Sequence, residues 1–472
     1  MMKKKSTFLF YDYETFGTNP CKDKIAQFAS IRTDKNFNII EKPVVLYCKI
    51  PEYYIPNPDS ILITGILPTY VNYHGLNESE FSKNIYNIMK KPNTCIVGYN
   101  NINFDDEFTR NIFYRNFIDP YEWSWRKNNS RWDILNLVIA CYVLRPFKIK
   151  WFIKKNKQVS LKLAHLIKIN NLNFNQPHDA LNDVYSTISI AKLINNKQKK
   201  LFSFFFNYRK KRKLVELINI FYMTPLIHIS TLYNKSKYMS IILPVIWHKY
   251  YTNSLIYFNL NENIKNFFEI CEKYKNKKKL NFIEIIKKNK SLNILNVNKC
   301  PIFVPLKFFN VKKFLNFNIN YKYCLKNLKL IKQKKNLKEI ILNLFKIKIN
   351  NYSSDVELQL YNNFFEEKDK KIIKKIRNMK NINEIQKINF NNYDNRIKKL
   401  LFKYKYINFY KDIKKTDKKI WQKYCKRKIK KKITIYYQKI DELMLKYKKN
   451  KKKKKILTQI KEYYIYLNNL TS

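Results

Sequence analysis

Glycine, acidic side chains and long apolar runs are all scarce in this chain of 472 residues. The four glycines lie at positions 17, 65, 75 and 98, so later turns must be made by Asn, Pro and Lys. No apolar run approaches the roughly 18 residues of a membrane-spanning helix, and no signal peptide follows the basic start. The eight cysteines form no CxxC pair, which argues against a disulfide framework or a zinc site. We therefore expect a cytoplasmic protein with no membrane partner.

Basic residues greatly outnumber acidic ones. There are 94 Lys and Arg against 35 Asp and Glu, which gives a formal net charge of +59 at pH 7. Such a chain is expected to bind a polyanion, and nucleic acid is the leading candidate. AT-biased coding accounts for part of this excess, so the distribution is more informative than the total. Residues 1–190 carry 25 basic and 17 acidic residues, whereas the other 282 carry 69 and 18. Acid is thus retained in the first part, and the rest is strongly cationic.

The chain is too long for one hydrophobic core, and its composition and hydrophobic periodicity change at two places. Residues 7–195 alternate apolar strands with amphipathic helices, which favours an α/β or α+β domain with a mixed sheet. Residues 199–350 contain short β-rich runs between Lys and Asn loops, typical of a small barrel with helical additions. Residues 352–472 lack Pro and Gly. Segments such as VELQLYNNFF and RIKKLLFKYKY have helical periodicity there, so we expect a helical bundle.

Two carboxylates interrupt an otherwise apolar strand, FLFYDYETFG. Asp12 and Glu14 are two residues apart, so in a strand they project from the same face, about 6.5 to 7 Å apart along the chain. Such a pair repels and resists burial unless a cation lies between its members. The strand therefore predicts a metal site.

Three more polar residues lie at or just before the starts of two expected helices. Asp105, in GYNNINFDDEFTR, begins an amphipathic helix, where a carboxylate also gains from the helix dipole. His178 and Asp183, in HDALNDVY, lie before and one turn into a second helix. The neighbouring acids Asp106 and Glu107 are interpreted as first-turn acids, and Asp179 as a helix cap.

Taken in order, these motifs resemble the DEDD exonucleases of the histidine branch. D-x-E matches Asp12 to Glu14, N-x-x-x-D matches Asn101 to Asp105, and H-x-x-x-x-D matches His178 to Asp183. Longer segments are similar to the bacterial exodeoxyribonuclease I family, and the resemblance covers nearly the whole chain. They include YDYETFGTNP, NSRWDILN, ACYVLRP, LFSFFFNYRKKRKL, VNKCPIF and QLYNNFF.

The resemblance implies a ribonuclease-H-like exonuclease domain, a Src-homology-3-like barrel domain and an all-α C-terminal domain. It implies that two Mg²⁺ ions are held by four carboxylates, Asp12, Glu14, Asp105 and Asp183, with His178 as the general base. The implied reaction is processive 3′-to-5′ hydrolysis of single-stranded DNA to 5′-mononucleotides, in DNA repair and recombination. We expect a monomer that also binds the C-terminal tail of single-stranded-DNA-binding protein.

Aromatic residues among cations are what single-strand binding needs, although the same aromatics could be ordinary core residues. By resemblance, the DNA-contacting positions are Arg110, Tyr121, Trp125, Arg145 and Lys162, and Glu14 also contacts substrate. Lys162 stands where the family has arginine, so it keeps the charge and loses bidentate geometry.

Two other functions fit part of the sequence. An RNA 3′-end-trimming exonuclease could use the same metal site, but the long cationic region after residue 199 argues against it. A non-catalytic single-strand DNA-binding protein would fit the charge, but it has no reason to keep the clustered acids of Asp12, Glu14, Asp105 and Asp183 in so basic a chain.

Overall fold

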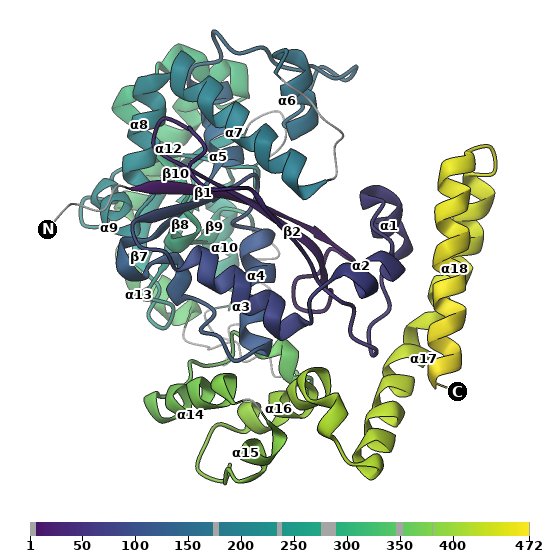
Figure 1. Ribbon diagram of the computed structural model, residues 1–472. Helices are drawn as coiled ribbons and strands as arrows, with labels where there is room; N and C mark the ends of the chain where they lie inside the picture. The colour runs from purple at the N-terminus through teal and green to yellow at the C-terminus, as the bar shows by residue number, and fades with distance from the viewer. Residues whose placement is uncertain are drawn as a thin grey trace, which may run out of the picture. The chain divides into compact units, whose positions relative to one another are not determined.

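The computed structural model describes residues 6–172, 179–233, 238–274, 289–345, 353–379 and 381–471 (Figure 1). It divides into two compact units. The first consists of the described residues of 1–130, 174–188 and 351–472, and the second of those of 131–173 and 189–350. In the part of the chain that the structure describes, we find no helix with the length and hydropathy to span a bilayer.

The first sheet is built around β1 (Thr7–Thr15). It pairs antiparallel with β2 (Ile25–Thr33), which pairs antiparallel with β3 (Val44–Tyr47), and it pairs parallel with β4 (Thr94–Gly98). The strand order is β3-β2-β1-β4-β5, where β5 spans Ser130–Asp133. The mixed sheet predicted for the first region is therefore confirmed.

Helices of the first unit come from both ends of the chain. From the N-terminal part they are α1 (Pro58–Thr64), α2 (Pro68–His74), α3 (Glu78–Met89) and α4 (Asp105–Arg115). From the C-terminal part they are α14 (Glu367–Asn378), α15 (Ile382–Gln386), α16 (Asn395–Asn408), α17 (Lys415–Lys446) and α18 (Lys451–Thr471). Helix α7 (Ala180–Lys197) begins in the first unit and continues into the second.

Side chains of β1 alternate between two faces of the sheet. Leu9, Tyr11 and Tyr13 pack in one hydrophobic cluster with Phe81 of α3 and Phe108 of α4. Because successive strand residues point to opposite faces, the side chains at positions 12 and 14 leave this core and lie on the other face.

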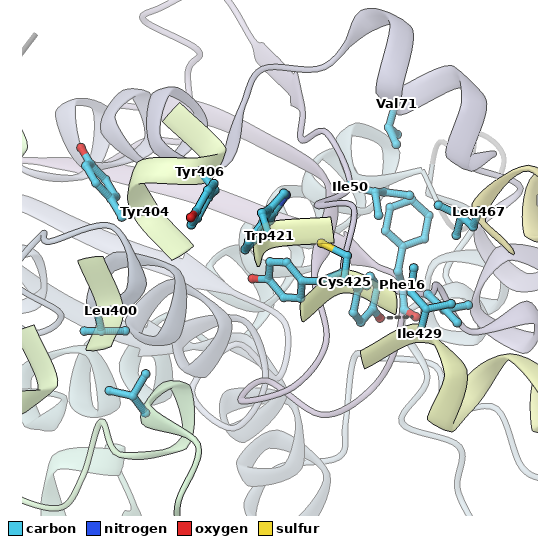
Figure 2. Close-up of a cluster of buried hydrophobic side chains, with 14 of the residues drawn as sticks. Phe16, Ile50, Val71, Leu400, Tyr404, Tyr406, Trp421, Cys425, Ile429 and Leu467 are labelled. Carbon is cyan, nitrogen blue, oxygen red and sulfur yellow. Dashed lines mark hydrogen bonds between the residues drawn. The ribbon is translucent and has the colours of Figure 1, made fainter. Parts of the chain in front are cut away.

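The C-terminal helices share a hydrophobic core with the N-terminal part of the unit (Figure 2). Phe16, Ile50 and Val71 belong to the same cluster of buried residues as Trp421 and Leu467. Trp421 also donates its indole N–H to the Glu52 carboxylate over 2.8 Å. The last helices are therefore part of the fold that carries β1.

A buried ion network joins the same two parts of the chain. The Arg115 guanidinium lies 2.9 Å from the Glu78 carboxylate, and the Lys24 ammonium lies 3.6 Å from both Glu78 and Glu357. Lys403 lies 2.8 Å from Glu357. All five side chains are buried, so each charge depends on the others for compensation.

The second unit contains an antiparallel sheet in the order β10-β6-β7-β8-β9. Its strands are β6 (Leu226–Ile229), β7 (Met239–Trp247), β8 (Ser254–Asn259), β9 (Leu292–Asn296) and β10 (Ile302–Pro305). Its helices are α5 (Ile134–Leu144), α6 (Leu163–Ile169), α8 (Lys199–Tyr208), α9 (Lys211–Leu214), α10 (Ile264–Tyr274), α12 (Tyr321–Gln333) and α13 (Leu337–Leu344). The β-rich texture predicted for this region is confirmed.

The helix predicted for residues 356–365 is wrong. Only a 3-10 turn, η7 (Val356–Leu358), forms there, and turns follow it. The guanidinium of Arg396 donates to the carbonyl of Gln359 at 3.2 Å and to that of Asn363 at 2.8 Å. The carbonyl of Gln359 accepts the N–H of Asn362 in a turn as well as the Arg396 side chain, and periodicity alone gives no sign of the contacts from α16.

Candidate active site

The first motif lies in a rigid position on the sheet. Asp12 and Glu14 are on β1, paired on one side with β2 and, over Thr7 to Phe10, with β4 on the other. Asp12 is partly buried and Glu14 is buried. The pairing with β2 therefore fixes the backbone from which both carboxylates project.

The start of α4 is tied to the same strand. The backbone N–H of Tyr13, the residue between Asp12 and Glu14 in the sequence, donates to Oδ1 of Asp105 over 3.2 Å. The hydroxyl of Tyr11 donates to Asp106 over 2.5 Å, and the hydroxyls of Tyr13 and Thr109 lie 3.0 Å apart. Asp106 is fully buried, so this first-turn acid joins strand to helix.

The start of α7 supplies the fourth predicted carboxylate. Asp179 caps the helix, because its Oδ1 accepts the backbone N–H of Leu181 over 3.0 Å, as predicted. Asp183 lies in the first turn, where its N–H donates to the carbonyl of Asp179 over 3.0 Å. Ligand oxygens of Asp12, Glu14 and Asp183 all lie within 4.8 Å of one another.

Burial and like charge act together on these acids. Burial, followed by the negative charge of Asp105, raises the pKa of Asp12 well above its ordinary value. Burial, followed by the charge of Asp183, raises the pKa of Glu14 to about 8. The carboxylates therefore oppose one another's ionisation at neutral pH.

A divalent cation fits this donor set. The donors are carboxylate oxygens, which hard cations prefer, and ligands at about 2.0 to 2.6 Å from one ion are at most about 5 Å apart. The separation of at most 4.8 Å within the group agrees with that limit. A bound cation would also reverse the repulsion that raises the pKa of Asp12 and of Glu14.

The described structure does not test three of the predicted site residues. His178 lies outside the described residues. Arg145 and Lys162 are exposed residues of the second unit, at the end of α5 and at the start of α6. The structure therefore assigns none of the three to the carboxylate group.

Two other predicted DNA contacts, Arg110 and Tyr121, lie in the first unit beside Tyr361 and Phe364. We call these four residues the aromatic cluster. The Arg110 guanidinium lies 5.7 Å from the ring centre of Tyr121 and 3.3 Å from the Tyr361 hydroxyl. The rings of Tyr121 and Phe364 are 5.7 Å apart, and Phe364 is 81% exposed. Trp125, also predicted, is 65% exposed.

Tyr361 and Phe364 were not among the predicted contacts. They lie in QLYNNFF, within the segment whose periodicity predicts a helix. Large aromatic residues flanked by asparagines in a basic chain are typical of single-strand binding. This pattern could have predicted both residues as stacking positions.

Three family models match successive parts of the chain. A model described as Exonuclease matches residues 9–191, one described as Exonuclease I SH3-like domain matches 209–347, and one described as Exonuclease I C-terminal domain matches 354–467. The first includes Asp12, Glu14 and Asp183. Fold and site together define a hydrolase of the exonuclease class that uses a divalent metal.

Known proteins match over nearly the whole length. Exodeoxyribonuclease I of Buchnera aphidicola subsp. Schizaphis graminum (strain Sg) is 45% identical over 469 residues, 98% of this chain and 96% of the relative. A structure of E. coli exonuclease I in complex with a dA16 oligonucleotide is 36% identical with a TM-score of 0.91, covering 98% of this chain and 100% of that chain. A structure of SSB/exonuclease I with the inhibitor CFAM has the same identity, TM-score and coverage. The chain belongs to the exodeoxyribonuclease I family, and the predicted class and three-part fold are confirmed.

Proposed function

We propose that this chain is a Mg²⁺-dependent exodeoxyribonuclease that releases 5′-mononucleotides from the 3′ end of single-stranded DNA. The observation that carries the proposal is the group of Asp12, Glu14 and Asp183 within 4.8 Å on the first sheet. The E. coli relative was solved with a DNA oligonucleotide, which supports single-stranded DNA as the substrate.

In this proposal Asp12, Glu14, Asp105 and Asp183 hold the metal. Two Mg²⁺ ions bound there would lower the pKa of an attacking water and stabilise the leaving 3′ oxygen. Asp105 is kept in place by the N–H of Tyr13, so α4 and β1 present their acids together. Glu14 also faces the substrate.

His178 takes the proton of the attacking water in this proposal. The assignment rests on its place in HDALND, five residues before Asp183. A neutral imidazole, with an ordinary pKa of about 6.5, is suited to accept a proton near neutral pH.

The aromatic cluster provides a path for the strand. Base stacking on Tyr121 and Phe364 needs no particular sequence, and Arg110 can bind a phosphate beside them. We also propose DNA contacts for Trp125 in the first unit and, separately, for Arg145 and Lys162 in the second. Replacing Phe364 by Ala should weaken single-strand binding by about 1 to 3 kcal/mol, whereas the equally exposed Phe221 is the matched control.

The cationic region after residue 199 holds the strand between cleavage events, so hydrolysis is processive. The proposed division is an exonuclease domain over 7–195, a barrel domain over 199–350 and a helical domain over 352–472. The test uses the full chain bound to labelled DNA, with excess unlabelled DNA added at the start of the reaction. Complete degradation of each bound strand supports processivity, and stalling after a few nucleotides overturns it.

A second partner is the acidic C-terminal tail of single-stranded-DNA-binding protein. A similar structure pairs SSB with exonuclease I, and this chain has a net charge of +59. Binding of such a peptide should weaken as salt rises. We also propose that the protein works as a monomer in a reducing cytoplasm, where it would serve DNA repair and recombination.

The main experiment separates the three candidate functions. Labelled DNA and RNA oligomers are incubated with the protein, with and without Mg²⁺, and mononucleotides are measured. We expect release from single-stranded DNA only with Mg²⁺. Equal release from RNA would favour an RNA-trimming enzyme, and DNA binding with no release would favour a non-catalytic binding protein.

A further inference from the structure

A buried amide on β2 lies in the same row as the strand acids. Gln27 is directly opposite Glu14 in the β1–β2 pair and directly opposite Tyr47 in the β2–β3 pair. Residues directly opposite in antiparallel strands share a face, so Gln27 lies on the face that carries Glu14 and Asp12. It is 3% exposed.

Both ends of this amide contact the start of α7. Oε1 of Gln27 accepts the backbone N–H of Ala180 over 3.2 Å, and Nε2 donates to Oδ1 of Asp179 over 3.3 Å. Nε2 also donates to the hydroxyl of Tyr47 over 3.2 Å. The orientation of the amide follows from its partners, because a backbone N–H can only donate and an ionised carboxylate can only accept.

The same helical turn carries Asp183. Asp179 caps the helix through Leu181, and its carbonyl accepts the N–H of Asp183 over 3.0 Å. Gln27 is therefore one short chain of hydrogen bonds away from the carboxylate that approaches Asp12 and Glu14 within 4.8 Å. If the start of α7 shifts on the sheet, this separation changes.

We propose that Gln27 is a positioning residue of the active site: it fixes the first turn of α7 to β2 and thereby sets Asp183 against the acids of β1. This inference rests on the proposed function, because it gives Gln27 a purpose only if those acids hold a metal. Its three hydrogen bonds go to Asp179, Ala180 and Tyr47, none of which is a proposed metal ligand. Groups of this kind orient ligands through hydrogen bonds, and their loss lowers metal affinity or activity by about 10 to 100-fold.

The test compares two variants that remove different hydrogen bonds of one amide. Gln27→Met keeps an unbranched side chain of similar length and removes all three bonds. Tyr47→Phe keeps its ring and removes only the bond toward β3. For Gln27→Met we expect kcat to fall and the half-saturating Mg²⁺ concentration to rise, each by about 10 to 100-fold. KM for single-stranded DNA should stay within about threefold, because strand contacts are unchanged.

A second readout does not depend on activity. Mg²⁺ should raise the melting temperature of the wild type and of Tyr47→Phe, and it should raise that of Gln27→Met much less. If Gln27→Met does not fold, Gln27→Asn replaces it, since its amide is one methylene too short to reach α7.

The outcomes are distinct. If kcat and Mg²⁺ half-saturation of the Gln27 variant stay within about twofold of wild type, or if Tyr47→Phe shows the same losses, Gln27 does not position the site. If the wild type itself releases no nucleotides with Mg²⁺, the proposed function fails instead.

Discussion

Two buried glutamates of the first unit have opposite electrostatic surroundings. Glu14 on β1 is 8% exposed, and Glu357 in η7 is 9% exposed. Burial and the charge of Asp183 raise the pKa of Glu14 to about 8. Burial acts in the same direction on Glu357, but Lys24 and Lys403 outweigh it and hold its pKa well below the ordinary value.

This difference in surroundings distinguishes a candidate functional site, around Glu14, from an ion network that stabilises the fold, around Glu357. In the network around Glu357, opposite charges lie 2.8 to 3.6 Å apart and compensate one another inside the fold. Around Glu14, carboxylates face carboxylates, and their free energy is lowered by protonation or by a bound cation. Buried charges that the fold leaves in repulsion mark a candidate functional site.

The largest effect should come from removing a member of the repelling group. Asp12→Ala or Asp183→Ala should lower nucleotide release by about 10⁴-fold or more, because metal ions contribute several kcal/mol to the transition state. Single-strand binding should persist, since phosphate contacts elsewhere supply it. Gel-based release assays and filter binding measure the two properties. Full activity in either variant would remove these residues from the metal site.

The next effect concerns the proposed proton acceptor. His178→Ala should lower kcat by about 10² to 10⁴-fold, the usual contribution of a general base. His74→Ala is the control, because His74 is an exposed histidine of α2 in the same unit. Single-turnover rates with Mg²⁺ for the two variants and the wild type measure this effect. A rate near wild type for His178→Ala would transfer the base role to another group.

Much of this site could be predicted from sequence, because the D-x-E motif depends only on the two-residue period of a strand. Asp105 and Asp183 follow from motif spacing, and the structure places both at helix starts beside β1. Gln27 could not be found in the same way. Its contacts to α7 join residues more than 150 positions apart, and a glutamine in a strand has no pattern that reveals them.

Substitutions in the ion network around Glu357 should lower the stability of the fold and should not act on the cleavage reaction itself. Glu357→Gln leaves Lys24 and Lys403 facing a neutral amide in a buried place, so the free energy of unfolding should fall by about 3 to 5 kcal/mol. The exposed pair of Glu367 and Lys370 is the control, and Glu367→Gln should leave the free energy of unfolding nearly unchanged, because water screens this pair. Urea unfolding at pH 7 measures both changes.

The pH dependence gives this prediction a second check. The pKa of Glu357 is lower in the folded than in the unfolded chain, so its stabilisation is present above the unfolded pKa and is lost as pH falls through the folded one. The difference between wild type and Glu357→Gln should therefore shrink in acid. A difference that stayed constant down to pH 3 would show that charge is not the cause.

Contacts between segments far apart in the sequence were harder to predict than the residues of the site. Helical periodicity after residue 352 identifies α16, but it does not show that Trp421 and Leu467 share a core with Phe16. Nor does it show that Arg396 binds the carbonyls of Gln359 and Asn363 and so prevents a helix there. Both results depend on contacts between segments, which local periodicity does not record.

The smallest effect should have the opposite sign from that of Glu357→Gln. The pKa of Glu14 is higher in the folded than in the unfolded chain, so its contribution to stability is present at low pH and is lost as pH rises toward about 8. Glu14→Gln cannot ionise and avoids this loss. Without metal at high pH, we expect it to be more stable than wild type, because the amide avoids the cost of ionising a buried carboxylate beside Asp183.

Thermal unfolding in chelator at pH 5 and at pH 8.5 checks this sign. The two proteins should be nearly equal at the lower pH and should separate at the higher one. Adding Mg²⁺ at pH 8.5 should then stabilise the wild type more than Glu14→Gln, because the ion binds the ionised carboxylate. A Glu14→Gln variant that is less stable than wild type in chelator at pH 8.5 would mean that Glu14, like Glu357, is compensated within the fold, and the contrast between the two regions would fail.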